Sequence, residues 1–136
     1  MIPLARARRA AVLVLVAAMT TAATGCVRRD AADSRVRVTW LLAPQPPVAG
    51  AAELTVAPAT PDGSPIEGAT VRLEGHMSHA GMAPVIADGT ERRPGEYLIP
   101  FTFTMAGDWV LLVSIVERDG TRTQQRIDVA AVRAAS

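Results

Sequence analysis

The side chains of this sequence that are best suited to bind a ligand lie in one short segment. Residues 75–84 read Gly-His-Met-Ser-His-Ala-Gly-Met-Ala-Pro, so both histidines of the chain and two of its five methionines fall between positions 76 and 82. Imidazole is the commonest side-chain ligand of metal ions, and a thioether is a soft ligand that favours Cu(I). The segment therefore predicts a metal site, with a copper ion as the expected ligand.

The expected backbone of this segment decides which of its side chains can meet. Side chains two positions apart point to the same face of an extended strand, so Met77 and His79 are predicted to share one face and His76 to point to the other. Gly81 allows a sharp return of the chain, which would bring Met82 back beside them. The predicted ligands within the segment are therefore Met77, His79, Met82 and His76.

A further ligand, Met105, is predicted from the order of the loops. If successive strands run antiparallel from end to end of the molecule, alternate loops fall at the same end. The loops placed together in this way are residues 44–51, 76–83 and 105–108. A strand miscounted between residues 84 and 96 would reverse the placement. The Pro44-Gln45-Pro46-Pro47 loop is expected to rim the site as a stiff, extended stretch.

The same residues also allow an interpretation without metal. Surface loops often contain a histidine, and methionines often fill the space beneath a loop, an explanation that applies most directly to Met105. The alternative function is therefore an interaction module of the cell envelope, whose His/Met loop contacts another protein without metal.

The segments that must position these residues have the pattern of β-strands. Apolar and polar residues alternate in several stretches separated by Gly, Pro and Asp turn signals, and no segment after residue 30 has a sustained helical period. The strands expected are 35–42, 53–56, 70–74, 84–87, 97–103, 109–115 and 126–129. We predict an all-β fold, an immunoglobulin-like β-sandwich of about seven antiparallel strands over residues 35–131.

The first 25 residues have the layout of a signal peptide. Three arginines, Arg6, Arg8 and Arg9, precede an apolar stretch and then small residues. Residues 23–26, Ala23-Thr24-Gly25-Cys26, resemble the lipobox of bacterial lipoproteins, with Ala23 where that motif usually has leucine. Lipidation would also explain Cys26, the only cysteine of the chain. We expect a lipoprotein signal peptide at 1–25, a lipid on Cys26 and a tether at 26–34. A retained membrane helix and an ordinary cleaved signal are the alternatives.

Length and charge exclude other classes of protein. A chain of 136 residues, of which 20% are charged, suits one globular domain. All 14 basic residues are arginines, against 13 acidic residues, and without the three arginines of the first 25 residues the net charge is 11 − 13 = −2. The sequence contains no block of basic residues of the kind that indicates nucleic-acid binding.

No catalytic pattern is present either. Ser78 and His79, the only plausible nucleophile and base, are adjacent and would point to opposite faces of a strand. The sequence also lacks the motifs of serine hydrolases, nucleotide-binding folds, calcium loops and zinc knuckles. We therefore expect no enzymatic activity.

Three motifs in order resemble the YtkA-like and FixH-like family of exported bacterial domains. They are the Met/His stretch from Met77 to Val85, which contains Gly-Met-Ala-Pro, then Gly95-Glu96-Tyr97, and then Phe103-Thr104-Met105-Ala106-Gly107-Asp108-Trp109. The resemblance covers about residues 48–129. It implies a β-sandwich connected with copper or other heavy metals outside the cytoplasm, with Met77, His79, Met82 and Met105 as ligands and with Tyr97 and Trp109 serving the fold.

The sequence thus predicts a lipid-anchored protein of the cell membrane with its domain on the extracytoplasmic face. The expected function is the capture or delivery of copper, with an envelope metalloprotein or an efflux system as the partner. FixH-like proteins usually have a membrane helix, and this chain has a lipobox-like sequence instead, which weakens the connection with oxidase assembly.

Overall fold

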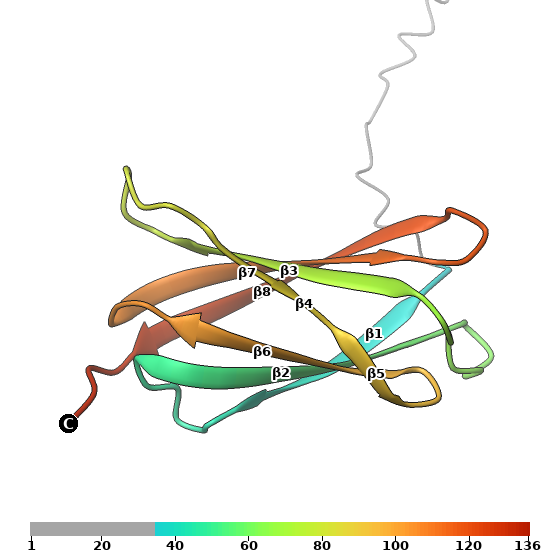
Figure 1. Ribbon diagram of the computed structural model, residues 1–136, viewed down its shortest axis with the longest axis horizontal. Coiled ribbons are helices and arrows are strands. Elements are labelled where there is room, and N and C mark those ends of the chain that lie inside the picture. Colours follow the sequence, from blue (N-terminus) through green and yellow to red (C-terminus); the bar gives the residue numbers. More distant parts are fainter. Residues whose placement is uncertain (1–34) are drawn as a thin grey trace, which may run out of the picture.

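The computed structural model describes residues 35–136, which form two four-stranded sheets packed face to face (Figure 1). One sheet has the order β1 (Arg37–Ala43), β2 (Gly50–Ala59), β6 (Glu96–Phe103), β5 (Thr90–Arg93). The other has the order β4 (Val85–Asp88), β3 (Thr70–Met77), β7 (Gly107–Val116), β8 (Arg122–Val132). All neighbouring strands are antiparallel, which confirms the predicted all-β sandwich. The predicted signal peptide, tether and Cys26 lie outside the described residues.

The core is formed by the apolar residues that alternate with polar ones along the strands. In β7 every second side chain, from Trp109 to Ile115, is buried between the sheets, and β6 supplies the facing layer from Tyr97 to Phe103. No polar or charged side chain other than the Tyr97 hydroxyl is buried among the described residues. That hydroxyl donates to the carbonyl of Ile66 at 2.8 Å and accepts from the N–H of Ala69 at 2.9 Å, so it ties β6 to the connection between β2 and β3.

The structure has eight strands rather than the seven predicted, because β5 was missed. All four residues of β5, Thr-Glu-Arg-Arg, are exposed, so the strand has no apolar alternation to reveal it. A single residue, Gly89, joins β4 in one sheet to β5 in the other, and its N–H donates to the carbonyl of Val71 at 2.8 Å. Figure 1 shows β4 and β5 as one continuous path across the molecule. The extra strand therefore does not reverse the direction of the chain.

Because β5 does not reverse the direction of the chain, the predicted grouping of three loops at one end of the sandwich is confirmed. Gly50 pairs with Phe103 and Met77 pairs with Trp109, which places the loops 44–49, 78–84 and 104–106 at one end of the sandwich. We call this end the Met end. The connections 60–69 and 117–121 and the β5–β6 turn lie at the opposite end, where the chain also enters β1 from Arg35 (Figure 1).

The proline loop differs from the expected extended rim. Residues 44–46 are a series of bends, with cis peptide bonds before Pro44 and Pro46. Its backbone contacts go to the C-terminal segment: Arg133 donates to the carbonyl of Pro47 at 2.9 Å, and Ala49 donates to the carbonyl of Arg133 at 2.7 Å. The loop is thus at the predicted end, but its hydrogen bonds fasten it to the chain after β8. Within residues 35–136, no helix is long and apolar enough to cross a membrane.

Candidate metal centre

Met77 is the last residue of β3, and the alternation of that strand turns it toward the interior. Val71 and Leu73 are buried on the same face, and Met77 is half-buried and packs against the core. Its methyl group lies over the backbone of Gly107, where an added Cβ would be only 3.1 Å from Met77 Cε. Gly107 therefore makes room for the Met77 side chain at the start of β7.

Trp109 links Met77 to Met105. It is the residue opposite Met77 in the β3–β7 register, it is 2% exposed, and its ring packs edge-to-face on Phe103 with centroids 5.4 Å apart. The indole Nε1–H donates to the carbonyl of Met105 at 3.1 Å. The ring lies beside Gly75, where an added Cβ would be 3.7 Å from the ring and 3.3 Å from Leu111 Cδ2. One buried indole thus fastens the 104–106 loop beside the end of β3.

His79 and Met82 lie in the turn that follows β3. The strand ends at Met77, and both the N–H and the hydroxyl of Ser78 donate to the carbonyl of Asp108, at 3.1 and 3.3 Å. His79 is exposed in the turn, so the predicted alternation that would place it on the face of Met77 does not extend to it. The strand prediction was wrong here because the chain turns away directly after Ser78.

The exposure of the methionines bears on the interpretation without metal. Met82 is 42% and Met105 is 49% exposed, so neither fills the space beneath a loop, whereas Met77 does pack against the core. Exposed thioethers at the end of the sandwich are accessible to an ion or to another molecule. The core-filling explanation therefore applies to Met77 alone.

His76 lies on the outer face of its sheet, as the alternation predicts. Its Nε2 is 2.8 Å from Glu74 Oε1, and its neighbour across the register is Val110. Because Met77 is on the inner face of β3, the strand separates the side chain of His76 from that of Met77. His76 remains a candidate ligand only for a site on the outer face of the sheet.

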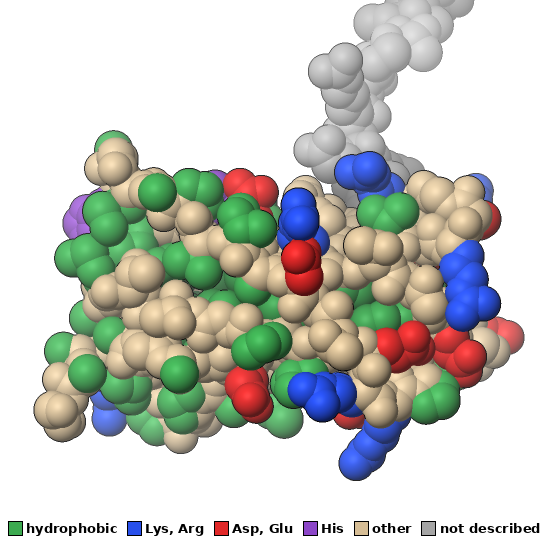
Figure 2. Space-filling model, viewed as in Figure 1, with side chains coloured by type: hydrophobic (Ala, Val, Ile, Leu, Met, Phe, Trp, Pro, Cys, Tyr) green, Lys and Arg blue, Asp and Glu red, His purple; other side chains and the backbone are tan. Residues whose placement is uncertain are grey.

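The Met end carries no formal charge in its loops. None of the residues 44–49, 78–84 and 104–106 is Asp, Glu, Lys or Arg. Figure 2 shows most of the visible charged side chains away from this end, where hydrophobic side chains and histidine gather. Among residues 35–136, no three His, Cys, Asp or Glu side chains are grouped as a metal site would require. The donors available here are thus neutral thioethers and the imidazole of His79, a set that fits a soft ion such as copper.

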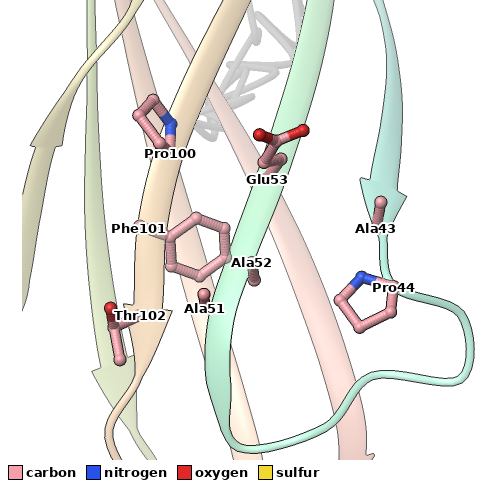
Figure 3. A pocket seen from close by; sticks show the side chains of 8 residues that line it. All are labelled: Ala43, Pro44, Ala51, Ala52, Glu53, Pro100, Phe101 and Thr102. Atoms are coloured by element: carbon pink, nitrogen blue, oxygen red, sulfur yellow. The ribbon is translucent and has the colours of Figure 1, made fainter.

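A cavity that none of the predicted ligands lines has Pro44 of the proline loop in its wall. It has a volume of about 610 Å³ and lies beside β1, β2 and β6 (Figure 3). Its walls are Ala43, Pro44, Ala51, Ala52, Glu53, Pro100, Phe101 and Thr102. It contains none of the predicted ligands, and its lining is mostly apolar with one carboxylate.

Sequence reasoning missed two residues that shape the Met end, Gly107 and the indole donor of Trp109. The spacing Met-x-Gly-x-Trp carried the signal, because it places a residue without a side chain between a thioether and a large hydrogen-bond donor. The contact with Met77 depends on the pairing of β3 with β7, which no local pattern reveals.

Two solved structures are similar to this chain. The soluble domain of PmoD from Methylocystis sp. (Rockwell) is similar, with 11% identity and a TM-score of 0.45 over 74% of this chain and 90% of that one. MtrC from Shewanella baltica OS185 is also similar, with 13% identity and a TM-score of 0.45 over 74% of this chain and 23% of that one. The chain thus corresponds to less than a quarter of MtrC.

No curated protein matches the chain. The YtkA-like family, in contrast, matches it over residues 30–114. Since that match spans more than half of the 136 residues and includes the candidate ligands from His76 to Met105, the chain belongs to the YtkA-like family.

Proposed function

We propose that this protein is a membrane-anchored, extracytoplasmic copper-binding protein that captures or delivers copper through its Met end. The observation that carries the proposal is the placement of Met77, Met82 and Met105 at one end of the sandwich, where the three loops contain no charged residue and two of the three methionines are about half exposed. Its role is binding rather than catalysis, with an envelope metalloprotein or an efflux system as the partner.

The chemistry of the donors supports this proposal. Thioethers are soft ligands and need no deprotonation, so a site built from them binds copper without releasing protons. Trp109 and Gly107 hold Met105 and Met77 at neighbouring positions, and the exposed turn brings His79 and Met82 to the same end. Partly exposed donors such as Met82 and Met105 suit an ion that must be both bound and released.

The proposed anchor is compatible with this placement. The N-terminal segment would be cleaved before Cys26, and the lipid on Cys26 would hold the domain at the extracytoplasmic face of the cell membrane. The chain enters β1 at the end opposite the Met end, so the methionines face away from the point of attachment (Figure 1). A partner in the envelope could then reach them.

One observation favours the alternative function, an envelope interaction module without metal. Interface cores are depleted in charged residues and enriched in methionine, and the Met end has both properties. The two functions differ in whether the methionines and His79 retain an ion.

Copper content separates them. We expect the full chain, purified under reducing conditions from copper-supplied cells, to contain about one copper ion per protein by elemental analysis. The variant Met77→Ala/His79→Ala/Met82→Ala should lose the metal. Ile86→Ala removes an apolar side chain that is 51% exposed on β4 and should keep it. Equal copper in the triple variant and the parent, or none in either, would favour the interaction module.

A further inference from the structure

We infer that the Met end selects a monovalent soft cation, Cu(I) or its analogue Ag(I), over Cu(II) and Zn(II). This inference rests on the proposed copper-binding function and adds the charge of the ion and the reason for its selection. The evidence is that the side-chain donors that the fold brings to the Met end are uncharged.

The donors at the Met end are neutral. They are the thioethers of Met77, Met82 and Met105 and the imidazole of His79, and the three loops contain no carboxylate. The two nearest carboxylates in sequence are occupied elsewhere. Asp108 accepts the N–H of Ala131 at 2.8 Å, and Glu74 lies 2.8 Å from His76 on the outer face of the sheet.

Neutral donors favour an ion of low charge. The free energy needed to dehydrate an ion rises with the square of its charge, and a divalent ion in a protein is ordinarily compensated by carboxylates, thiolates or several imidazoles. The Met end offers one imidazole, because His76 faces the other side of β3. Three thioethers and one imidazole match the preferences of Cu(I) and leave the charge of Zn(II) or Cu(II) uncompensated.

The fluorescence of Trp109 can be used to measure ion binding at the Met end. It lies opposite Met77, and its Nε1–H holds the carbonyl of Met105, so an ion between these thioethers would lie close to the indole. The only other tryptophan, Trp40, is on β1 and is 44% exposed. The variant Trp40→Phe leaves Trp109 as the single fluorophore.

The test is a fluorescence titration of the full chain carrying Trp40→Phe, with silver nitrate in a chloride-free, weakly coordinating buffer. We expect a saturable change in Trp109 emission at about one equivalent of Ag(I). Zn(II) or Cu(II) at about 100-fold excess should leave the apparent Ag(I) affinity unchanged.

Variants in the same background locate the ion. His79→Gln and Met77→Leu/Met105→Leu should each weaken Ag(I) binding by about tenfold or more, while His76→Gln should not change it. The leucines retain the apolar volume, and circular dichroism verifies that each variant is folded. His79 is exposed in a turn, so its variant tests the site without disturbing the core.

The outcomes distinguish this inference from the proposed function. Competition by Zn(II) or Cu(II) at comparable concentrations would overturn the selectivity and leave metal binding intact. Loss of Ag(I) binding in His76→Gln would overturn the assignment of ligands. Absence of binding by all three ions would overturn both proposals.

Discussion

Gly107 is the residue on which the geometry of the Met end depends most directly. Its φ of +131° is a conformation that residues with side chains rarely adopt, and the methyl of Met77 lies only 3.1 Å from where its Cβ would be. Gly50 provides a comparison, because it has a similar φ of +121° but nothing within 4 Å of its added Cβ. Backbone strain and crowding can therefore be separated with two substitutions.

Gly107→Ala should lower the free energy of unfolding by more than Gly50→Ala does. Both should lose about 1–3 kcal/mol from the unfavourable backbone conformation, and Gly107→Ala should also displace Met77. Urea unfolding measures the two losses. Introducing Met77→Ala should remove the excess, and equal losses with Met77 present would show that the contact has no energetic weight.

At the scale of the strands, the alternation of apolar and polar residues predicted the strands that have one buried face. It did not predict a strand that is exposed on both faces. The alternation of β3, β6 and β7 is visible because each strand has one side in the core. β5 is exposed along its whole length, so it could not be recognised. The extended backbone expected from Met77 to His79 was wrong because the chain bends at Ser78 and turns at Ala80 and Gly81.

The candidate site was also predictable only in part. The clustering of His76, Met77, His79 and Met82 is a property of the sequence, and the loop order was enough to place Met105 at their end. The contact of Gly107 with Met77 depends on the register between β3 and β7. That register arises from the packing of the whole sandwich.

Glu91 connects elements at the end opposite the methionines, and its titration should be visible in the stability of the fold. Its carboxylate accepts the N–H of Gly95 at 3.0 Å and that of Gly68 at 3.1 Å, so β5 is joined to the β5–β6 turn and to the β2–β3 connection. These hydrogen bonds, that from Gly95 foremost, hold the pKa of Glu91 below its usual value of 4.5. The ionised carboxylate therefore stabilises the fold.

Because the pKa is lowered in the folded state, this stabilisation is complete above the usual pKa of the carboxyl and is lost as the pH falls through the folded value. Glu91→Gln should accordingly show a smaller loss of stability on acidification from pH 6 to pH 3 than the parent, as measured by urea midpoints. Glu53→Gln, on the outer face of β2, controls for the removal of one charge. An unchanged acid dependence in Glu91→Gln would show that the two hydrogen bonds do not contribute.

The whole molecule has two unlike ends. The Met end has uncharged loops, whereas the opposite end carries charged residues in its connections and receives the N-terminal part of the chain at Arg35. This polarity matters if the N-terminus is anchored, because it directs the candidate ligands away from the membrane.

Substituting Cys26 tests the anchor on which this orientation depends. Cys26→Ser should move the protein from the membrane fraction to the soluble fraction, because a lipidated cysteine provides stable attachment through its acyl chains. Immunoblots of fractionated cells measure the distribution, and His79→Gln serves as a control that should remain with the membranes. Unchanged membrane association of Cys26→Ser would indicate a retained N-terminal helix instead.

The passage of the chain through Gly89 has a consequence for how the sandwich can open. At that edge β4 and β5 are one continuous strand shared by both sheets, and an added Cβ on Gly89 would lie 3.1 Å from the side chain of Ile99 and 3.2 Å from that of Val71. The sheets therefore cannot separate there without breaking pairings in both. At the other edge β1 and β8 each pair with one neighbour within their own sheet, and the hydrogen bonds of Arg133 with Pro47 and Ala49 join the two sheets near the Met end. Thermal opening should begin at the β1–β8 side, while the β3–β7 pair that carries Met77 and Trp109 stays closed.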